Sequence, residues 1–360
     1  MATTRRRVEP ARALSRPAIA QVDRSGQLDD VLSLPEHLRD ALWRVDSAHL
    51  EPQDSPGGLV VAGMGGSAIG AALALAALGD HASRPIFPAR TYGLPPWTTP
   101  DTTVLCSSYS GETEETLGCF EAAGALGARR IVATTGGRLA EQARAEDVPV
   151  IPLPGGFAPR AAVGYLTVAV LEVAALCGVG PRMATEIDVA ASHTDQLAQQ
   201  WGPEGPEDGL AKALARGLHD TVPVVVGAGL TAPLAYRWKT QFNENAKIPS
   251  FASELPEMDH NELVGWTSSK ALGQFSAVFL DDADEHPRIK QRIEMTEKLI
   301  APAARATFRV ETSGQTTVER VISLVLLGDL VSIYLATLGG VDPGPIQPIE
   351  DLRQALAESP

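Results

Sequence analysis

Residues 106–113 read Cys-Ser-Ser-Tyr-Ser-Gly-Glu-Thr, a short segment in which five hydroxyl side chains accompany one glycine. Val104 and Leu105 before it are typical of a buried strand, and residues 114–123 after it predict a helix. The backbone N–H groups at a helix start carry the positive end of the helix dipole, so hydroxyls in a strand–turn–helix unit can converge on an anion. We therefore expect a phosphate to bind Ser108, Ser110, Thr113 and the backbone at Gly111.

This turn contains no Lys or Arg. A nucleotide-triphosphate loop would require Gly-Lys-Ser or Gly-Lys-Thr, so the turn favours a compact phosphomonoester held by neutral donors. The alternative is a helix-capping serine followed by a solvated turn, which would account for a single serine. The presence of three such hydroxyls favours binding.

Strand and helix patterns alternate through the first half of the chain. Residues 59–62 predict a buried strand, residues 63–66 a glycine turn and residues 68–77 a helix. The same alternation continues with strands at 85–89, 103–107, 130–134 and 148–153 and with helices at 113–126, 138–145 and 161–177. Such alternation predicts an α/β fold with a parallel sheet covered by helices on both faces.

The second half repeats this opening. Val222–Val226 followed by Gly227-Ala228-Gly229 restates the first strand and its glycine turn. Further strands are expected at 249–252, 276–280 and 307–311, with helices at 286–299 and 316–338. The chain is thus predicted to be an internal duplication of two doubly wound subdomains: an N-terminal helical extension (1–56), a first subdomain (57–199), a linker (200–208), a second subdomain (209–341) and a C-terminal tail helix (342–360).

The counterpart of the hydroxyl turn in the second half is acidic. It reads Asp281-Asp282-Ala283-Asp284-Glu285, which repels phosphate. We therefore expect one anion site per chain, in the first subdomain.

Composition limits the partners. A net charge of −14 argues against nucleic acid, whose binders need basic faces. Cys106, Cys119 and Cys177 have no metal-ligand spacing and fit a reducing cytoplasm. No secretory signal follows the arginines at 5–7, and apolar residues 163–179 and 321–341 are each interrupted by a carboxylate, as in buried helices of a soluble protein. No membrane partner is expected.

Two other kinds of site were weighed. Gly63-x-Gly65-x-x-Ala68 matches a dinucleotide-binding fingerprint, but the second strand is followed by Arg90 where an acidic ribose ligand would be needed, so NAD ranks below a sugar phosphate. A metal site formed by Glu257, Asp259, His260 and Glu262 has no recognised ligand spacing.

Three titratable residues are candidates for catalytic groups. Glu244 ends a predicted helix, and His260 follows 16 positions later. Arg160 opens a long apolar helix, where its cation meets the positive end of the dipole, so an anionic partner is expected. Each of these residues could instead form a surface cap or a structural ion pair.

Five motifs together carry a family resemblance. Gly63-Met64-Gly65-Gly66-Ser67, the hydroxyl turn 108–113, Pro159-Arg160-Ala161-Ala162, residues 243–247 (Asn-Glu-Asn-Ala-Lys) and residues 259–262 (Asp-His-Asn-Glu) occur in order, and the chain from Gly57 onward resembles the bifunctional phosphoglucose/phosphomannose isomerases. The resemblance implies two sugar isomerase (SIS) subdomains, a homodimer with shared active sites and no metal or other cofactor. Its implied reaction interconverts glucose 6-phosphate or mannose 6-phosphate with fructose 6-phosphate through a cis-enediol.

The resemblance also implies residue roles. The phosphate ligands would be Ser67, Ser108, Ser110 and Thr113, with close backbone approach at Gly65, Gly66 and Gly111. Glu244 would be the base, His260 would open the sugar ring, and Arg160 would stabilise the enediolate.

One departure concerns the C-terminal tail. The family has a lysine there that assists the histidine, and Arg353 is expected in its place, although Arg cannot give up its proton. The main rival function is a SIS protein that binds a sugar phosphate as a signal and catalyses nothing.

Overall fold

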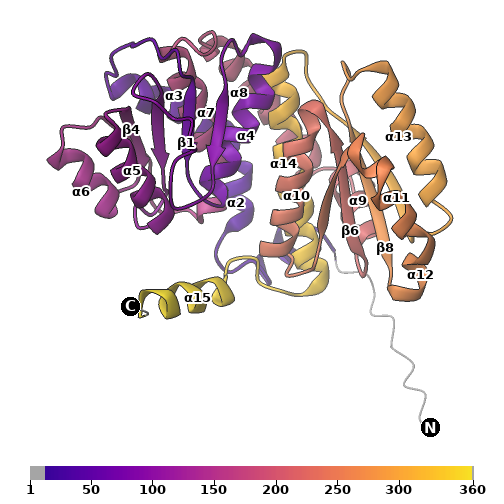
Figure 1. Ribbon diagram of the computed structural model, residues 1–360. Coiled ribbons are helices and arrows are strands. Elements are labelled where there is room, and N and C mark those ends of the chain that lie inside the picture. Colours follow the sequence, from indigo (N-terminus) through magenta and orange to yellow (C-terminus); the bar gives the residue numbers. More distant parts are fainter. Residues whose placement is uncertain (1–12, 359–360) are drawn as a thin grey trace.

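The structure is a computed structural model that describes residues 13–358, and its elements form two α/β lobes on either side of a shared layer of helices (Figure 1). The N-terminal lobe is drawn in indigo to magenta and the C-terminal lobe in orange. Residues 1–12 of the expected N-terminal extension and residues 359–360 of the tail lie outside the described part.

The first sheet has five parallel strands in the order β2-β1-β3-β4-β5. Their bounds are β1 (Leu59–Ala62), β2 (Ile86–Ala89), β3 (Thr103–Ser107), β4 (Arg129–Thr134) and β5 (Val150–Pro152). All residues of β1 and β3 are buried. Burial on both faces is what a parallel sheet requires, and it explains the continuous apolar runs in these segments.

The second sheet has four parallel strands in the order β7-β6-β8-β9. They are β6 (Val222–Ala228), β7 (Phe251–Leu255), β8 (Phe275–Asp281) and β9 (Ala306–Glu311). In each sheet the first strand along the chain is an interior strand, the second lies at the edge on one side of it, and the third and fourth follow on the other side. This shared order confirms the predicted duplication.

Fifteen α-helices cover the sheets in the described residues. They are α1 (Arg16–Ala20), α2 (Gln27–Leu32), α3 (Leu34–Ser47), α4 (Gly66–Leu78), α5 (Glu114–Leu126), α6 (Gly137–Ala145), α7 (Val163–Leu176), α8 (Ala184–Trp201), α9 (Leu210–Leu218), α10 (Ala232–Glu244), α11 (Glu262–Gly265), α12 (Ser269–Leu272), α13 (Pro287–Ile300), α14 (Thr317–Gly339) and α15 (Gln347–Ala357). Among the 3₁₀ turns, η2 (Pro159–Ala162) and η4 (Glu257–His260) bear on the site.

Alternate residues of the strands face two different cores. Leu59 and Val61 point into the large core shared with α4, α7 and α14, whereas Val60 and Ala62 point into a smaller core under α5 and α6. In the second lobe, Val225 faces the shared core and a separate core under α13 closes the outer face.

The two most apolar helical stretches lie inside this fold. The windows within Pro159–Leu176 and Thr317–Gly339 are long and apolar enough to span a membrane, but they are 78% and 94% buried in the protein. Helix α14 packs against α4, α8, α9 and α10 at the centre of the molecule. These stretches are therefore core helices, as predicted.

The lobes are oriented so that opposite edges of their sheets meet. Arg160 follows β5 and therefore lies at the carboxyl edge of the first sheet. Glu244 ends α10 just before β7 begins, which places it at the amino edge of the second sheet. Their side chains are 3.5 Å apart, so the carboxyl edge of one sheet faces the amino edge of the other.

Several boundaries differ from the sequence predictions. The strand expected at 148–153 is only Val150–Pro152, and the one expected at 249–252 is Phe251–Leu255. Helix α8 was not predicted, and it runs to Trp201, two residues into the segment taken as a linker. The domain boundaries given above remain an expectation.

Candidate active site

The predicted hydroxyl turn joins β3 to α5 at the carboxyl edge of the first sheet. Ser108 Oγ lies 2.9 Å from Thr113 Oγ1 and accepts a hydrogen bond from Gly111 N at 3.0 Å. Ser110 Oγ accepts from Glu112 N at 3.2 Å. The three hydroxyls are therefore ordered by the turn itself, beside the positive end of the α5 dipole.

The turn is held from behind by the segment between β4 and α6. Gly111 has φ +72°, and a Cβ built on it would lie 1.9 Å from Gly136 O. Leu139 N donates to Gly111 O at 3.0 Å. Glu112 accepts from Arg138 N at 2.9 Å and from Arg138 Nε at 3.0 Å. Because of the close approach and the positive φ, only glycine fits at position 111.

The glycine turn after β1 lies beside it. Gly65 has φ +52°, and a Cβ on Gly66 would lie 2.8 Å from Pro159 O, so α4 begins in contact with the turn that carries Arg160. Ser67 is 5% exposed. The starts of two long helices, α4 and α5, thus lie at the same edge of the sheet as Arg160.

Arg160 is 5% exposed and is bonded on all sides. Its Nε donates to Asn245 Oδ1 at 2.6 Å, its Nη2 donates to Pro343 O at 2.7 Å, and its Nη1 lies 3.5 Å from Glu244 Oε2. Burial lowers the pKa of Arg160, and the charge of Glu244 opposes this shift. Arg160 thus forms the ion pair within the chain that was the alternative to an anionic ligand.

A second, fully buried ion pair lies behind Arg160. Arg237 Nη2 lies 2.5 Å from Asp329 Oδ2 and also donates to the Arg160 carbonyl at 3.1 Å. The side chains of Arg237 and Asp329 are 2% and 5% exposed. This pair connects α10 and α14 to the Arg160 turn and fixes its position.

Glu244 remains accessible at the end of α10. Its side chain is 31% exposed, and Arg160 is its ion-pair partner in residues 13–358. Lys247 donates to the carbonyls of Glu244 and Pro343. Burial lowers the pKa of Lys247, and the nearby charge of Arg160 adds to the effect. The Glu244 carboxylate thus lies among cations with one side open.

His260 does not join this cluster within the chain. It follows the carboxyl end of β7, whereas Glu244 precedes the amino end of the same strand. A strand of this length spans about 17 Å at ~3.3 Å per residue, so the two lie at opposite edges of the second sheet. His260 is exposed on η4.

Arg353 also lies apart from Glu244. It is exposed on α15, which projects below the first lobe at the end of the chain (Figure 1). Within residues 13–358 it makes no ion pair or hydrogen bond that ties it to the Arg160 cluster.

The carboxylates weighed as metal ligands have protein partners. Asp259 accepts from Arg292 and Thr296 at 2.7 Å each. Glu262 accepts from Ser253, and Glu257 accepts from Asn261 at 2.8 Å. The described chain, residues 13–358, holds no group of three or more potential metal-ligating side chains.

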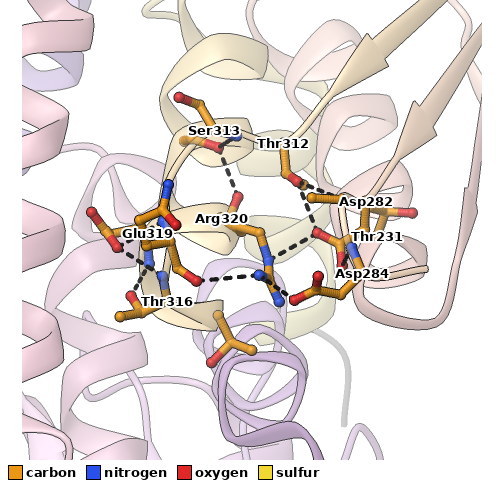
Figure 2. Close-up of polar contacts among 12 residues, drawn as sticks. Thr231, Asp282, Asp284, Thr312, Ser313, Thr316, Glu319 and Arg320 are labelled. Carbon is orange, nitrogen blue, oxygen red and sulfur yellow. Dashed lines mark hydrogen bonds and ion pairs between the residues drawn. The ribbon is translucent and has the colours of Figure 1, made fainter.

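In the second lobe, the acidic turn 281–285 corresponds to the hydroxyl turn of the first lobe. Its carboxylates form ion pairs with an arginine, Arg320 (Figure 2). Arg320 Nε lies 3.0 Å from Asp282 Oδ1, and Arg320 Nη1 lies 2.7 Å from Asp284 Oδ2. Thr312 Oγ1 donates to Asp282 Oδ1 at 2.8 Å. The Asp282 carboxylate thereby takes donors that an anion at this turn would need.

A cation, Arg90, occupies the end of β2, where a dinucleotide site would need an acidic residue for the ribose. Arg90, directly after β2, lies over the ring of Tyr236 at 5.2 Å. A carboxylate for the ribose of NAD is therefore lacking at the end of β2.

The sequence interpretation missed part of the site. Asn245 and Lys247 lay in a recognised motif without an assigned role, and the carbonyls of Pro343 and Gly344 gave no signal in the sequence. Asp329 was visible in the sequence, because a charged residue in the middle of an apolar helix needs a buried partner.

Comparisons with known proteins find similar sequences and a similar fold. A family model, "Bacterial phospho-glucose isomerase C-terminal SIS domain", matches residues 207–356. The bifunctional phosphoglucose/phosphomannose isomerase of Caldicellulosiruptor bescii is 37% identical, over 92% of this chain and 98% of its own length. The one from Aquifex aeolicus is 36% identical, over 83% and 90%. A hypothetical protein from Thermus thermophilus shares the fold, with a TM-score of 0.68 and 18% identity over 96% and 94% of the two chains.

Proposed function

We propose a mechanism for this chain from its membership of the bifunctional phosphoglucose/phosphomannose isomerase family. The family reaction interconverts glucose 6-phosphate and mannose 6-phosphate with fructose 6-phosphate. The protein is a sugar-phosphate aldose–ketose isomerase. The observation that carries the mechanism is the Glu244–Arg160 pair, which joins the base of one lobe to the phosphate-binding edge of the other.

The substrate would lie across the junction of the lobes. We place its 6-phosphate at Ser67, Ser108, Ser110 and Thr113, where neutral donors and two helix starts converge. Gly65, Gly66 and Gly111 allow the backbone to approach it. The carbonyl end then reaches Glu244.

Glu244 is the proposed base. It would remove the proton next to the carbonyl and return it to the neighbouring carbon, through a cis-enediol. Arg160 would stabilise the charge that develops on the substrate oxygens, and its four anchored contacts mean that little reorganisation is needed.

His260 would open the sugar ring from the partner subunit of a homodimer. Its place at the far edge of the second sheet supports this, because one chain cannot bring it to its own Glu244. The second lobe also exposes apolar side chains on and near its edge strand β7. Phe251 is 54% exposed, Val264 74% and Leu272 78%. Such a patch is typical of a subunit interface.

Arg353 would assist His260 only as a fixed charge. A guanidinium group does not act as a proton donor or acceptor in proteins, so the proton transfers of ring opening would fall to His260. We propose that no metal or other cofactor takes part.

The remaining partner assignments are also part of the proposal. The partners are a small sugar phosphate and a second copy of the chain, with no nucleic acid and no membrane. A cytoplasmic location is supported by Cys106, Cys119 and Cys177, which are all free and buried.

Turnover with EDTA present tests this function. Purified protein is incubated with fructose 6-phosphate in D₂O, and the formation of both aldoses and the exchange at C2 are followed. We expect both products and exchange at C2 without added metal. Binding of fructose 6-phosphate without turnover would instead identify a non-catalytic SIS binder.

A further inference from the structure

The N-terminal extension reaches the candidate active site. Helix α2 packs against η2, the turn that carries Arg160. Just before α2, Ser25 lies against Gly344, where an added Cβ would be only 2.2 Å from Ser25 Oγ. The Gly344 carbonyl in turn accepts from Arg160 at 3.1 Å. The segment 23–30 therefore forms a wall beside the Arg160 cluster.

This wall has a fixed shape. Asp23 is 8% exposed, and its carboxylate caps the start of α2 by accepting from Gln27 N at 3.0 Å and from Leu28 N at 2.8 Å. The cap holds the first turn of α2 in place, so the side chain at position 30 is presented from a rigid element.

Asp30 is a half-buried carboxylate with spare acceptor capacity. Its side chain accepts from Gln27 Nε2 at 3.3 Å, and within residues 13–358 no cation forms an ion pair with it. A carboxylate can accept about four hydrogen bonds, so most of this capacity is unused. Its charge acts on both the Arg160 guanidinium and the Tyr109 hydroxyl.

Both neighbours lie at the segment that carries Arg160. The Tyr109 hydroxyl accepts a hydrogen bond from Phe157 N at 3.0 Å, just before η2, and Arg160 on η2 pairs with Glu244. Asp30 is therefore on the Arg160 side of the proposed substrate site, where the hydroxyl groups of a sugar are the available donors.

We propose that Asp30 is a substrate-binding residue supplied by the N-terminal extension, and that its carboxylate accepts hydrogen bonds from sugar hydroxyls beside Arg160. This inference rests on the proposed function and extends it to a residue outside the five motifs. It also assigns a role to residues 23–30, which serve as part of the site.

The ionisation of Asp30 supplies a specific readout. Burial raises the pKa of Asp30 to about 6, the carboxylates of Asp23 and Asp29 add to the rise, and Arg160 opposes it. The ionised form is the better acceptor, so substrate binding through Asp30 weakens as the pH falls through about 6.

Other charged groups on the elements packed against α2 are already neutralised. On α14, Asp329 is paired with Arg237. On α3, burial lowers the pKa of His37 to about 4, which keeps its ring neutral at the pH of the assay. Burial raises the pKa of Asp329, and the charge of Arg237 opposes this rise. Loss of the inflection in Asp30→Asn therefore identifies Asp30 as the group responsible.

Asp30→Asn is the test variant, and Asp29→Asn is its matched control. Asp29 is the adjacent residue, but its carboxylate is 71% exposed and pairs with Arg16 at 2.6 Å. Calorimetry measures binding of fructose 6-phosphate and of inorganic phosphate, and steady-state kinetics gives kcat/KM from pH 5 to 9.

For Asp30→Asn we expect weaker fructose 6-phosphate binding by about tenfold or more, unchanged phosphate binding and loss of the kcat/KM inflection near pH 6. Its thermal stability at pH 8 is expected to equal or exceed that of the wild type, because a partly desolvated charge is removed. Asp29→Asn should bind fructose 6-phosphate as the wild type does and should keep the inflection, moved to somewhat lower pH because the Asp29 charge contributes to the rise of the Asp30 pKa.

The proposal is overturned if Asp30→Asn binds fructose 6-phosphate as the wild type does or keeps the same pH profile. Equal weakening for inorganic phosphate would also overturn it, because that result places the effect in the phosphate turn. Failure of the proposed function is seen separately as absence of turnover by the wild type, and the binding comparison stays decisive in that case.

Discussion

Replacing Gly111 by alanine tests the construction of the phosphate turn. A left-handed conformation costs a residue with a Cβ roughly 1–2 kcal/mol. In addition, the new Cβ would lie 1.9 Å from Gly136 O, so the two segments must separate and the Leu139 N to Gly111 O bond is lost. That bond contributes about 0.5–1.5 kcal/mol, which brings the expected loss of stability to about 1.5–3.5 kcal/mol.

The same movement displaces the proposed phosphate ligands. A hydrogen bond to a charged group contributes about 1.5–3 kcal/mol, so losing one raises KM for fructose 6-phosphate roughly 10- to 100-fold. The phosphate is bound equally in the ground and transition states, and kcat should therefore change little.

Gly127→Ala is the matched control. Gly127 ends α5 with φ +75°, but no atom lies within 4 Å of the place that an added Cβ would take, so only the conformational cost applies. Urea unfolding and steady-state kinetics are measured for both variants. If Gly111→Ala loses no more stability than Gly127→Ala and keeps the wild-type KM, the close packing of the turn is irrelevant to binding and our reasoning is refuted.

Three further predictions concern the base, the buried ion pair and a buried histidine. Glu244→Gln should lower kcat by ~10²- to 10⁴-fold while fructose 6-phosphate still binds in calorimetry, and near-normal turnover would remove Glu244 from the mechanism. Asp329→Asn leaves the buried Arg237 without a counter-charge and should cost about 3–5 kcal/mol of unfolding free energy, against at most about 1 kcal/mol for Asp195→Asn in an exposed pair with Arg39; similar losses would contradict this. Burial lowers the pKa of His37 to about 4, below its unfolded value, so its contribution to stability is full above about pH 6.5 and declines by about 1.4 kcal/mol per pH unit as the pH falls toward 4. Urea unfolding at pH 7 and pH 5 should show a smaller decline for His37→Gln than for the wild type, and equal declines would show that His37 is not the group responsible.

The fold was predictable because its signals are local. The strands β1, β3, β6 and β8 are continuous apolar runs, and the glycine turns after β1 and β6 mark the repeat. Helix α8 escaped because its apolar residues are diluted by polar ones along its length. The four-residue helices α11 and α12 are too short to produce a periodic pattern.

The site was only partly predictable because its contacts are distant in sequence. The hydroxyl turn is contained in eight consecutive residues and could be recognised directly. In contrast, Arg160 meets Asn245 across 85 positions and Pro343 across 183, and these contacts depend on how the two sheets face each other. The position of Asp30 beside Arg160 likewise arises from the packing of α2 on η2.

The central claim is that each active site combines Glu244 of one subunit with His260 of its partner, and a mixed dimer tests this most directly. Glu244→Gln and His260→Asn subunits with different tags are co-expressed, and the heterodimer is purified. Each variant alone should be nearly inactive, but the heterodimer holds one site with both residues intact and should show about half of the wild-type activity. A heterodimer as inactive as its parents would contradict the shared site.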